Sequence, residues 1–137
     1  MKVSNEVSPL ASRSLSTAAV RMPGAGEVFP AACPSRVVLD HVTSKWGVLV
    51  LVALADGPQR WSELRRRAEG VSEKMLAQTL RTLEADGLVH RDAQPVIPPR
   101  VDYSLTDRGG ELVALLLPLF GWVVDNADAI VGERGTA

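Results

Sequence analysis

The chain has 137 residues, of which 46% are hydrophobic and 4% aromatic, and its formal net charge is −1. This length suits one compact domain and argues against a two-domain enzyme, and the scarcity of aromatic residues favours an aliphatic, mostly helical core. Basic residues are concentrated between Gly57 and Arg108, whereas the stretch after them is acidic, so a nearly neutral chain can still present one cationic face.

The first segment of the chain differs in composition from the rest. Residues 1–32 are rich in Ser, Ala, Pro and Gly and show no sustained period, so we expect a flexible N-terminal tail there. Residues 33–131 carry the periodic patterns of a folded domain. Residues 132–137 are expected to form a short C-terminal tail.

Two helices are predicted at the start of the domain. Val37, Val38 and either His41 or Val42 fall at helical spacing. The following segment, KWGVLVLVALADG, is apolar nearly all round, which predicts a central buried helix of about a dozen residues that ends at the Asp-Gly-Pro sequence.

Two short helices joined by a tight turn are predicted next. The segment 61–68 places apolar residues at i, i+3 and i+7, so they share one helix face, and Gly70 ends this helix. Ser72 is suited to cap the second helix, which runs over residues 72–86 and stops at Gly87.

A hairpin follows the second short helix. Residues 88–93 and 100–105 predict two short strands, and residues 94–99 form a stiff, proline-bounded loop between them. The order helix, turn, helix, hairpin predicts a winged helix-turn-helix domain of the α+β class, mostly helical, with terminal dimerisation helices.

The last helical region is capped by Thr106 and runs from near Asp107 towards Ile130. Pro118 is expected to kink or split it, because proline lacks the helical N–H donor. Its apolar residues are too numerous for one stripe, so the helix must cover a surface besides its own core. The same helix in a second copy of the chain supplies that surface most simply, which predicts a homodimer.

The helix over residues 72–86 divides into two faces at roughly 100° per residue. Its inner face carries Leu76, Leu80 and Leu83. Its outer face carries Lys74, Gln78, Arg81 and Ala85, with Ser72 at the exposed amino end. Lysine, glutamine and arginine are able to bond base edges in the major groove, which is what a recognition helix needs. The alternative interpretation is an ordinary solvated face of an amphipathic helix.

Three adjacent arginines, 65–67, lie on the preceding short helix. In a helix-turn-helix motif this helix crosses the DNA backbone, so Arg65 is predicted to contact phosphate. Three consecutive side chains do not all point the same way, and the alternative is that one or two of them brace Glu63 or Glu69.

Arg91 and Arg100 flank the hairpin loop. The prolines in that loop limit its motion, so a contact from the wing to phosphate or to the minor groove loses less entropy on binding. The alternative for Arg100 is a local pair with Asp102.

Four stretches together resemble the HxlR family of bacterial winged-helix regulators, relatives of the MarR group. They are CPSRVVLDHVTSKWGVLVLVAL, WSELRRR, VSEKMLAQTLRTLEADGLVHR and PPRVDYSLTDRGGEL. The resemblance extends from Cys33 to about Trp122. It departs from the family pattern at Trp61, where Phe is usual, at Asp102, where Glu is common, and in a longer N-terminal tail.

The resemblance implies a sequence-specific transcriptional regulator that binds double-stranded DNA as a homodimer. The first and last helices then form the interface, and two recognition helices lie about one turn apart on a pseudo-palindromic operator. The residues expected at this interface are Val38, Leu116, Phe120 and Trp122.

Some members of the family sense oxidants or electrophiles through a cysteine near the amino end, and Cys33, followed by Pro34, matches that position. A thiol near a helix start is favoured as thiolate by the positive end of the helix. An oxidant or small-molecule effector is therefore an expected partner. The alternative is that Cys33 serves as a small buried apolar residue.

Other function classes fit the chain less well. A cysteine nucleophile needs a histidine base within reach, and neither His41 nor His90 stands in a recognisable catalytic or metal-ligand spacing with the single cysteine, so we expect no enzyme activity, no metal and no cofactor. A single cysteine, the lack of an apolar run of roughly 18 residues and the lack of a secretory signal indicate a cytoplasmic protein without a membrane partner. The remaining alternative is a winged-helix protein–protein interaction module without specific DNA binding.

Overall fold

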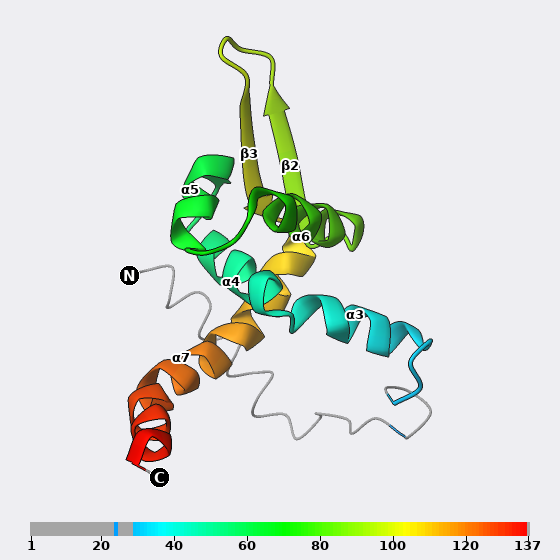
Figure 1. The fold of residues 1–137 in the computed structure, drawn as a ribbon. Helices are drawn as coiled ribbons and strands as arrows, with labels where there is room; N and C mark the ends of the chain where they lie inside the picture. The colour runs from blue at the N-terminus through cyan, green and yellow to red at the C-terminus, as the bar shows by residue number, and fades with distance from the viewer. Residues whose placement is uncertain (1–23, 25–28, 137) are drawn as a thin grey trace.

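The computed structural model describes Gly24 and residues 29–136, so most of the tail expected over residues 1–32 lies outside the described residues. The helices and strands follow one another in the order shown in Figure 1. They are α3 (Pro34–Val42), α4 (Lys45–Leu54), β1 (Gln59–Arg60), α5 (Trp61–Arg67), α6 (Glu73–Ala85), β2 (Val89–Gln94), β3 (Arg100–Leu105) and α7 (Asp107–Thr136).

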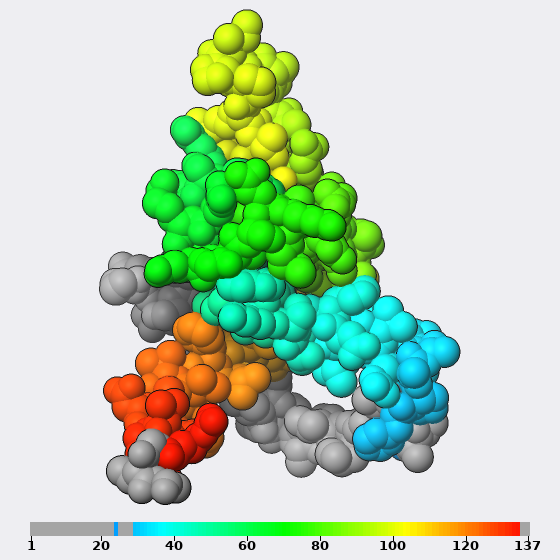
Figure 2. All heavy atoms as spheres, viewed as in Figure 1, coloured from blue at the N-terminus to red at the C-terminus, as the bar shows by residue number. Residues whose placement is uncertain are grey.

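The elements are arranged around α4. The β2–β3 hairpin projects from one end of the molecule, α5 and α6 lie at its base, and α3 and α7 leave the centre in different directions (Figure 1). The surface narrows towards the tip of the hairpin, which forms an isolated projection (Figure 2). The structure is therefore a winged helix-turn-helix fold, mostly helical, as the sequence predicts.

The sheet has three antiparallel strands in the order β1-β3-β2. The β2 and β3 strands pair from Val89 opposite Leu105 to Gln94 opposite Arg100, which confirms the predicted hairpin. The β1 strand is not foreseen by the sequence pattern, because two residues are too short to show an alternation. Gln59 pairs with Tyr103, and its buried side-chain amide donates to the carbonyl oxygen of Ala53 at the end of α4.

The hydrophobic core joins α4 to α5, α6, the hairpin and the first half of α7. Its largest fully buried side chains are Val50, Leu51, Leu54, Leu64, Leu76, Leu80, Leu83 and Val89. The three leucines of α6 are all among them, so the predicted inner face is confirmed. Each fully buried leucine contributes about 1.5–3 kcal/mol through the apolar area that it removes from water.

Side-chain caps begin the helices that matter most for the site. The hydroxyl oxygen of Ser72 accepts a hydrogen bond from the backbone N–H of Met75 at 3.0 Å, and Thr106 caps α7 in the same way through Gly109 at 3.0 Å. Both caps are as predicted. Gly87, with a φ of +77°, follows α6 in the left-handed conformation that commonly ends a helix.

The last helix is longer than the sequence pattern indicates. It runs without interruption through Pro118 and continues past Ile130 to Thr136, so most of the segment expected as a C-terminal tail is helical. Proline removes one helical hydrogen bond and leaves the others in place, so the helix is not split, although its direction changes along its length (Figure 1).

By length and composition, α7 is the one single helix among the described residues that could cross a membrane. The core helix of a globular domain can have the same length and composition. Val113 and Leu116 do lie in the hydrophobic core, and most of the apolar side chains farther along α7 are exposed.

Candidate nucleic-acid interface

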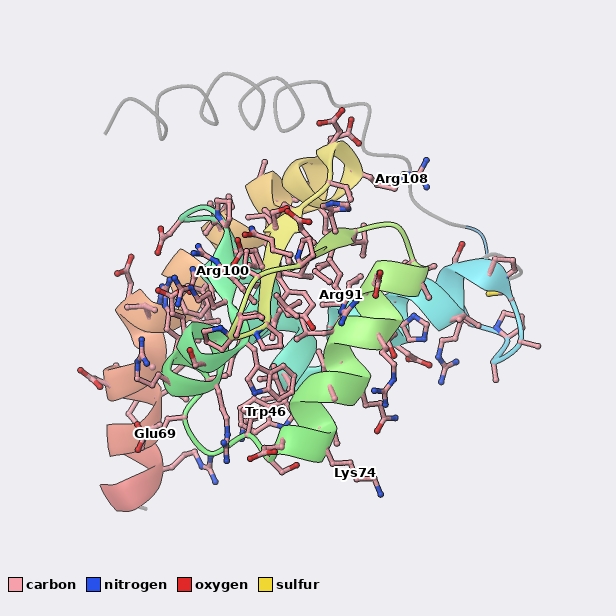
Figure 3. All side chains as sticks on the ribbon, turned by 90° about the horizontal axis from the view of Figure 1, so that it is seen from above. Trp46, Glu69, Lys74, Arg91, Arg100 and Arg108 are labelled. Atoms are coloured by element: carbon pink, nitrogen blue, oxygen red, sulfur yellow. The ribbon has the colours of Figure 1, made fainter. Side chains whose placement is uncertain are left out.

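The outer face of α6 is polar and open to solvent. Lys74, Gln78, Arg81 and Ala85 are all exposed, on the side of the helix opposite its buried leucines. Lys74 and Arg81 form no ion pair with any residue that the structure describes. Figure 3 shows Lys74 pointing away from the body of the molecule at one end of α6. These side chains are therefore available to an external ligand.

The turn between α5 and α6 holds the two helices at a fixed angle. Gly70 adopts a φ of +95°, a backbone conformation that residues other than glycine rarely adopt. Leu64, Ala68 and Val71 are buried on either side of this turn. These buried side chains hold α5 and α6 together, so that the outer face of α6 remains exposed to solvent.

The arginines of α5 have different surroundings. Arg65 pairs with Glu73 at the start of α6, 2.9 Å between Nη1 and Oε2, and Arg67 pairs with Asp56 at the same distance. The bracing partners are thus Glu73 and Asp56, not Glu63 and Glu69. The carboxylate of Glu63 instead accepts a hydrogen bond from the backbone N–H of Arg60, the residue before α5. The Arg65 pair is exposed and leaves the guanidinium accessible.

The wing carries the other two predicted arginines. Arg100 pairs with Asp102, 3.1 Å between Nε and Oδ1, as the alternative interpretation of its sequence neighbourhood expects. Arg91 is exposed, and with Arg81 it lines a cleft of about 410 Å³ between α6 and the wing, which also contains Trp61. Folding therefore brings Arg81 and Arg91 to one surface.

The sequence analysis does not single out the apolar tip of the wing. Ile97 is 99% exposed and Val96 is 48% exposed, next to the prolines of the loop. An exposed isoleucine at the apex of the molecule has no role in the core.

The model of the HxlR-like helix-turn-helix family matches residues 41–130. The chain belongs to the HxlR family. It is 51% identical to the HTH-type transcriptional regulator YtfH of Escherichia coli over 109 residues, which span 80% of this chain and 86% of that protein.

Two solved structures resemble this HxlR-family protein. The regulator YtfH of Salmonella typhimurium superposes with a TM-score of 0.73 at 51% identity, over 78% of this chain and 96% of that one. The redox regulator HypR in its oxidized form superposes with a TM-score of 0.64 at 38% identity, over 69% of this chain and 97% of that one. The protein is therefore a winged helix-turn-helix transcriptional regulator of the HxlR type.

The four residues predicted at a dimer interface differ in their exposure in this HxlR-family chain. Val38 on α3 and Trp122 on α7 are 46% and 58% exposed, and Phe120 is half-buried. Leu116 is only 7% exposed and packs in the core of its own protomer, so it differs from the interface position expected for it. Other apolar residues along α7 are exposed, and these are Leu115, Leu119, Val123, Val124, Ile130 and Val131.

Cys33 occupies the cap position immediately before α3. It is half-buried, and its backbone carbonyl oxygen accepts a hydrogen bond from the N–H of Val37 at 3.1 Å. Pro34 begins the helix directly after it. Cys33 is therefore placed at the start of the helix that carries Val38.

Proposed function

We propose that this regulator binds DNA sequence-specifically as a homodimer on a pseudo-palindromic operator. The observation that carries the proposal is the exposed face of α6, where Lys74, Gln78 and Arg81 project from a helix whose opposite side is locked into the core. A helix of this width enters the major groove, and these three side chain types match its donor and acceptor pattern. A regulator of this kind acts in the cytoplasm and needs no catalytic residue.

The remaining basic residues suit contacts to the DNA backbone. Arg65 lies on α5 and pairs with Glu73 at the start of α6, and Arg91 and Arg100 lie on the wing. Arg65 and Arg100 already have carboxylate partners. The Arg65–Glu73 pair is solvent-exposed, and such a pair contributes only about 0–1 kcal/mol, so its exchange for a phosphate is inexpensive. In the second pair Asp102 is only 17% exposed, but Arg100 is 42% exposed and open to a phosphate. These arginines position the protein while α6 reads the bases.

The exposed apolar residues of α3 and α7 support the homodimer. Val37, Val38 and Leu39 on α3 are exposed, and so are Trp122 and its apolar neighbours on α7. Exposed apolar surface that gathers into a patch marks a protein–protein contact. A two-fold axis would cover the same surface on both copies and would present two α6 helices to successive turns of one DNA face.

Salt-dependent binding to the promoter region upstream of the protein's own gene tests this proposal. If several phosphates are neutralised, the logarithm of the binding constant falls with the logarithm of the salt concentration, with a slope of about −0.9 for each phosphate. Random DNA of equal length should bind far more weakly. Affinity that ignores salt, or equal affinity for both DNAs, would instead favour a winged-helix module that binds protein.

We also propose that DNA binding responds to oxidants or electrophiles through Cys33. A structural relative, HypR, is described as a redox regulator, and Cys33 lies half-buried where α3 begins. A bulky or charged adduct on its sulfur would displace the start of a helix that we place in the dimer interface.

Diamide treatment followed by mass spectrometry and a DNA-binding assay tests this role. We expect a modified Cys33 and altered DNA affinity, and we expect the Cys33→Ser variant to bind DNA equally with and without diamide. An unmodified thiol with unchanged binding would leave Cys33 as a packing residue.

A further inference from the structure

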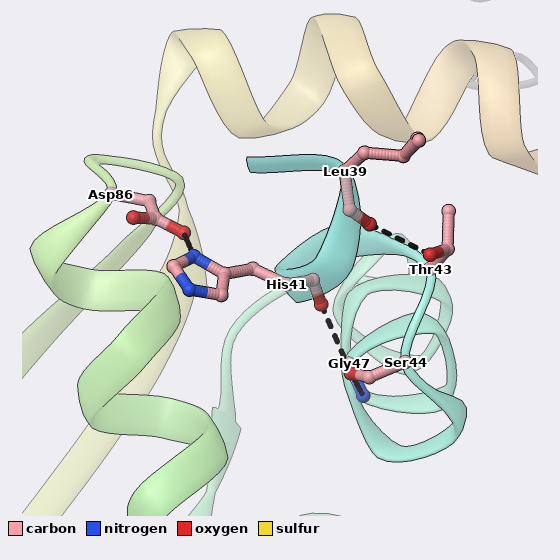
Figure 4. Close-up of polar contacts among 6 residues, drawn as sticks. All are labelled: Leu39, His41, Thr43, Ser44, Gly47 and Asp86. Atoms are coloured by element: carbon pink, nitrogen blue, oxygen red, sulfur yellow. Dashed lines mark hydrogen bonds and ion pairs between the residues drawn. The ribbon is translucent and has the colours of Figure 1, made fainter. Parts of the chain in front are cut away.

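A polar contact connects α3 to the far end of α6. Nδ1 of His41, in the last turn of α3, lies 2.7 Å from Oδ2 of Asp86, the residue that caps the C-terminus of α6 (Figure 4). A carboxylate only accepts hydrogen bonds, so the imidazole N–H donates. The two side chains are 32% and 19% exposed, so the contact is shielded from water more than a surface pair.

The His41 end of this contact is held rigidly. The carbonyl oxygen of His41 accepts a hydrogen bond from the hydroxyl of Ser44 at 3.0 Å, and Ser44 in turn caps α4 by accepting from the N–H of Gly47 (Figure 4). A Cβ atom on Gly47 would overlap the carbonyl oxygen of His41, so glycine permits the close approach of the two helices. These contacts fix the backbone of His41 at the junction of α3 and α4, where the chain direction bends by 69° between the two helices.

The negative charge of Asp86 is unfavourable at its position unless a hydrogen-bond donor pairs with it. Its N–H bonds to the carbonyl oxygen of Thr82 and closes the last turn of α6, so its carboxylate stands at the negative end of the helix dipole. A donor at this position offsets the repulsion, and His41 supplies it. The pairing of these two residues thus compensates a cost that an isolated aspartate would carry.

Apolar packing leaves this boundary between α3 and α6 incomplete. A cleft of about 180 Å³ separates the α3–α4 junction from the middle of α6, with Ser44 on one side and Gln78 and Thr82 on the other. Among the described residues, the His41–Asp86 contact is the one side-chain hydrogen bond that spans from α3 to α6 and its cap. The contact adds a directional link between α3 and the end of α6 to the apolar packing of Val42 and α4 in the core.

We infer that His41 and Asp86 are positioning residues that set the separation of the two DNA half-sites. The inference rests on the proposed function, in which α3 lies at the dimer interface and α6 in the major groove. A tilt of α6 relative to α3 would move the two recognition helices of a symmetric dimer in opposite directions, so each small change is doubled between half-sites. The pair therefore determines which operator spacing the dimer accepts.

The test uses the full-length dimer and duplexes that carry two identical half-sites, taken from a genomic fragment that the wild-type protein retains. Their separation is varied by single base pairs around one turn of about 10.5 base pairs. We expect the wild-type protein to show one preferred separation. The variants His41→Leu and Asp86→Ala should lose about tenfold in affinity at that separation and bind the neighbouring separations almost equally well.

Two further variants separate positioning from general damage. His41→Asn keeps an N–H donor close to the position of Nδ1 and should restore the wild-type preference. Arg36→Gln breaks the Arg36–Asp40 pair on the same helix without touching α6, and should leave the preference unchanged. Asp86→Ala removes the charge that opposes the helix dipole together with the hydrogen bond that compensates it, so its thermal unfolding should stay close to that of the wild type.

The inference is overturned if His41→Leu and Asp86→Ala keep the wild-type spacing preference, or if they lose the same factor at every spacing and on a single half-site. A wild-type protein that retains no genomic fragment, or that binds all spacings and random DNA equally, contradicts the proposed function itself. These two failures are therefore distinguishable.

Discussion

In the proposed function, single side chains on α6 determine which bases the regulator distinguishes. Gln78 offers both a donor and an acceptor, which suits the edge of adenine, and Arg81 offers the paired donors that suit guanine. Arg81 also shares the cleft between α6 and the wing with Arg91, so it can reach either a base or a phosphate. Only a comparison of specific with random DNA separates these two roles.

Replacement of Gln78 or Arg81 by alanine should weaken binding to the cognate site by about 1–3 kcal/mol if the residue reads a base. Fluorescence anisotropy with cognate and random duplexes would measure the effect. Arg134→Ala, which removes an equal charge near the end of α7, should have no such effect. An equal loss on both DNAs would reassign the residue to a phosphate contact.

At the level of elements, the start of α7 lies directly against the strand that follows α6. The backbone N–H of Thr106 donates to the carbonyl oxygen of Leu88 at 3.1 Å, and a Cβ atom on Gly109, in the first turn of α7, would overlap the same oxygen. The position next to it, Gly110, faces open space. Close packing therefore requires glycine at position 109 but not at position 110.

Gly109→Ala should destabilise the fold by about 1–3 kcal/mol, because its methyl group would overlap the carbonyl oxygen of Leu88 and force α7 outward. Gly110→Ala should be neutral or should stabilise α7 by up to about 1 kcal/mol, since alanine is the better helix former. Urea unfolding monitored by circular dichroism would measure both. Equal effects of the two substitutions would contradict the close approach at Gly109.

At the level of the whole molecule, α7 combines two functions along its length. Its first half contributes Val113 and Leu116 to the core, and its second half extends away from the domain with exposed apolar side chains (Figure 1). Leu116 therefore belongs to the core of the protomer, whereas exposed Trp122 belongs to the interface of the proposed dimer.

Trp122→Asp should give a folded monomer, because the charge would be buried only in the dimer. Leu116→Asp should instead prevent folding, because the carboxylate would be buried in the protomer's own core. Sedimentation velocity and thermal unfolding would distinguish the two outcomes. Ser62→Asp, at an exposed position on α5, serves as the control and should remain a folded dimer. A stable dimer carrying Trp122→Asp would place the interface elsewhere.

The sequence alone determined the features that depend on neighbouring residues. The two faces of α6, the caps at Ser72 and Thr106 and the hairpin all follow from local spacing and side-chain type, and the structure confirms them. These features are predictable because helical periodicity and capping act over a few residues.

Only the tertiary structure decided the features that join distant parts of the chain. The short β1 strand exists because Gln59 meets Tyr103, and the pair between His41 and Asp86 joins residues 45 positions apart. The side of α7 that faces the core is equally non-local, because a helix apolar nearly all round has no period that marks its inner face, and so Leu116 was expected at the interface. Such contacts depend on how the elements pack in three dimensions, and the local spacing of residues in the sequence does not predict that packing.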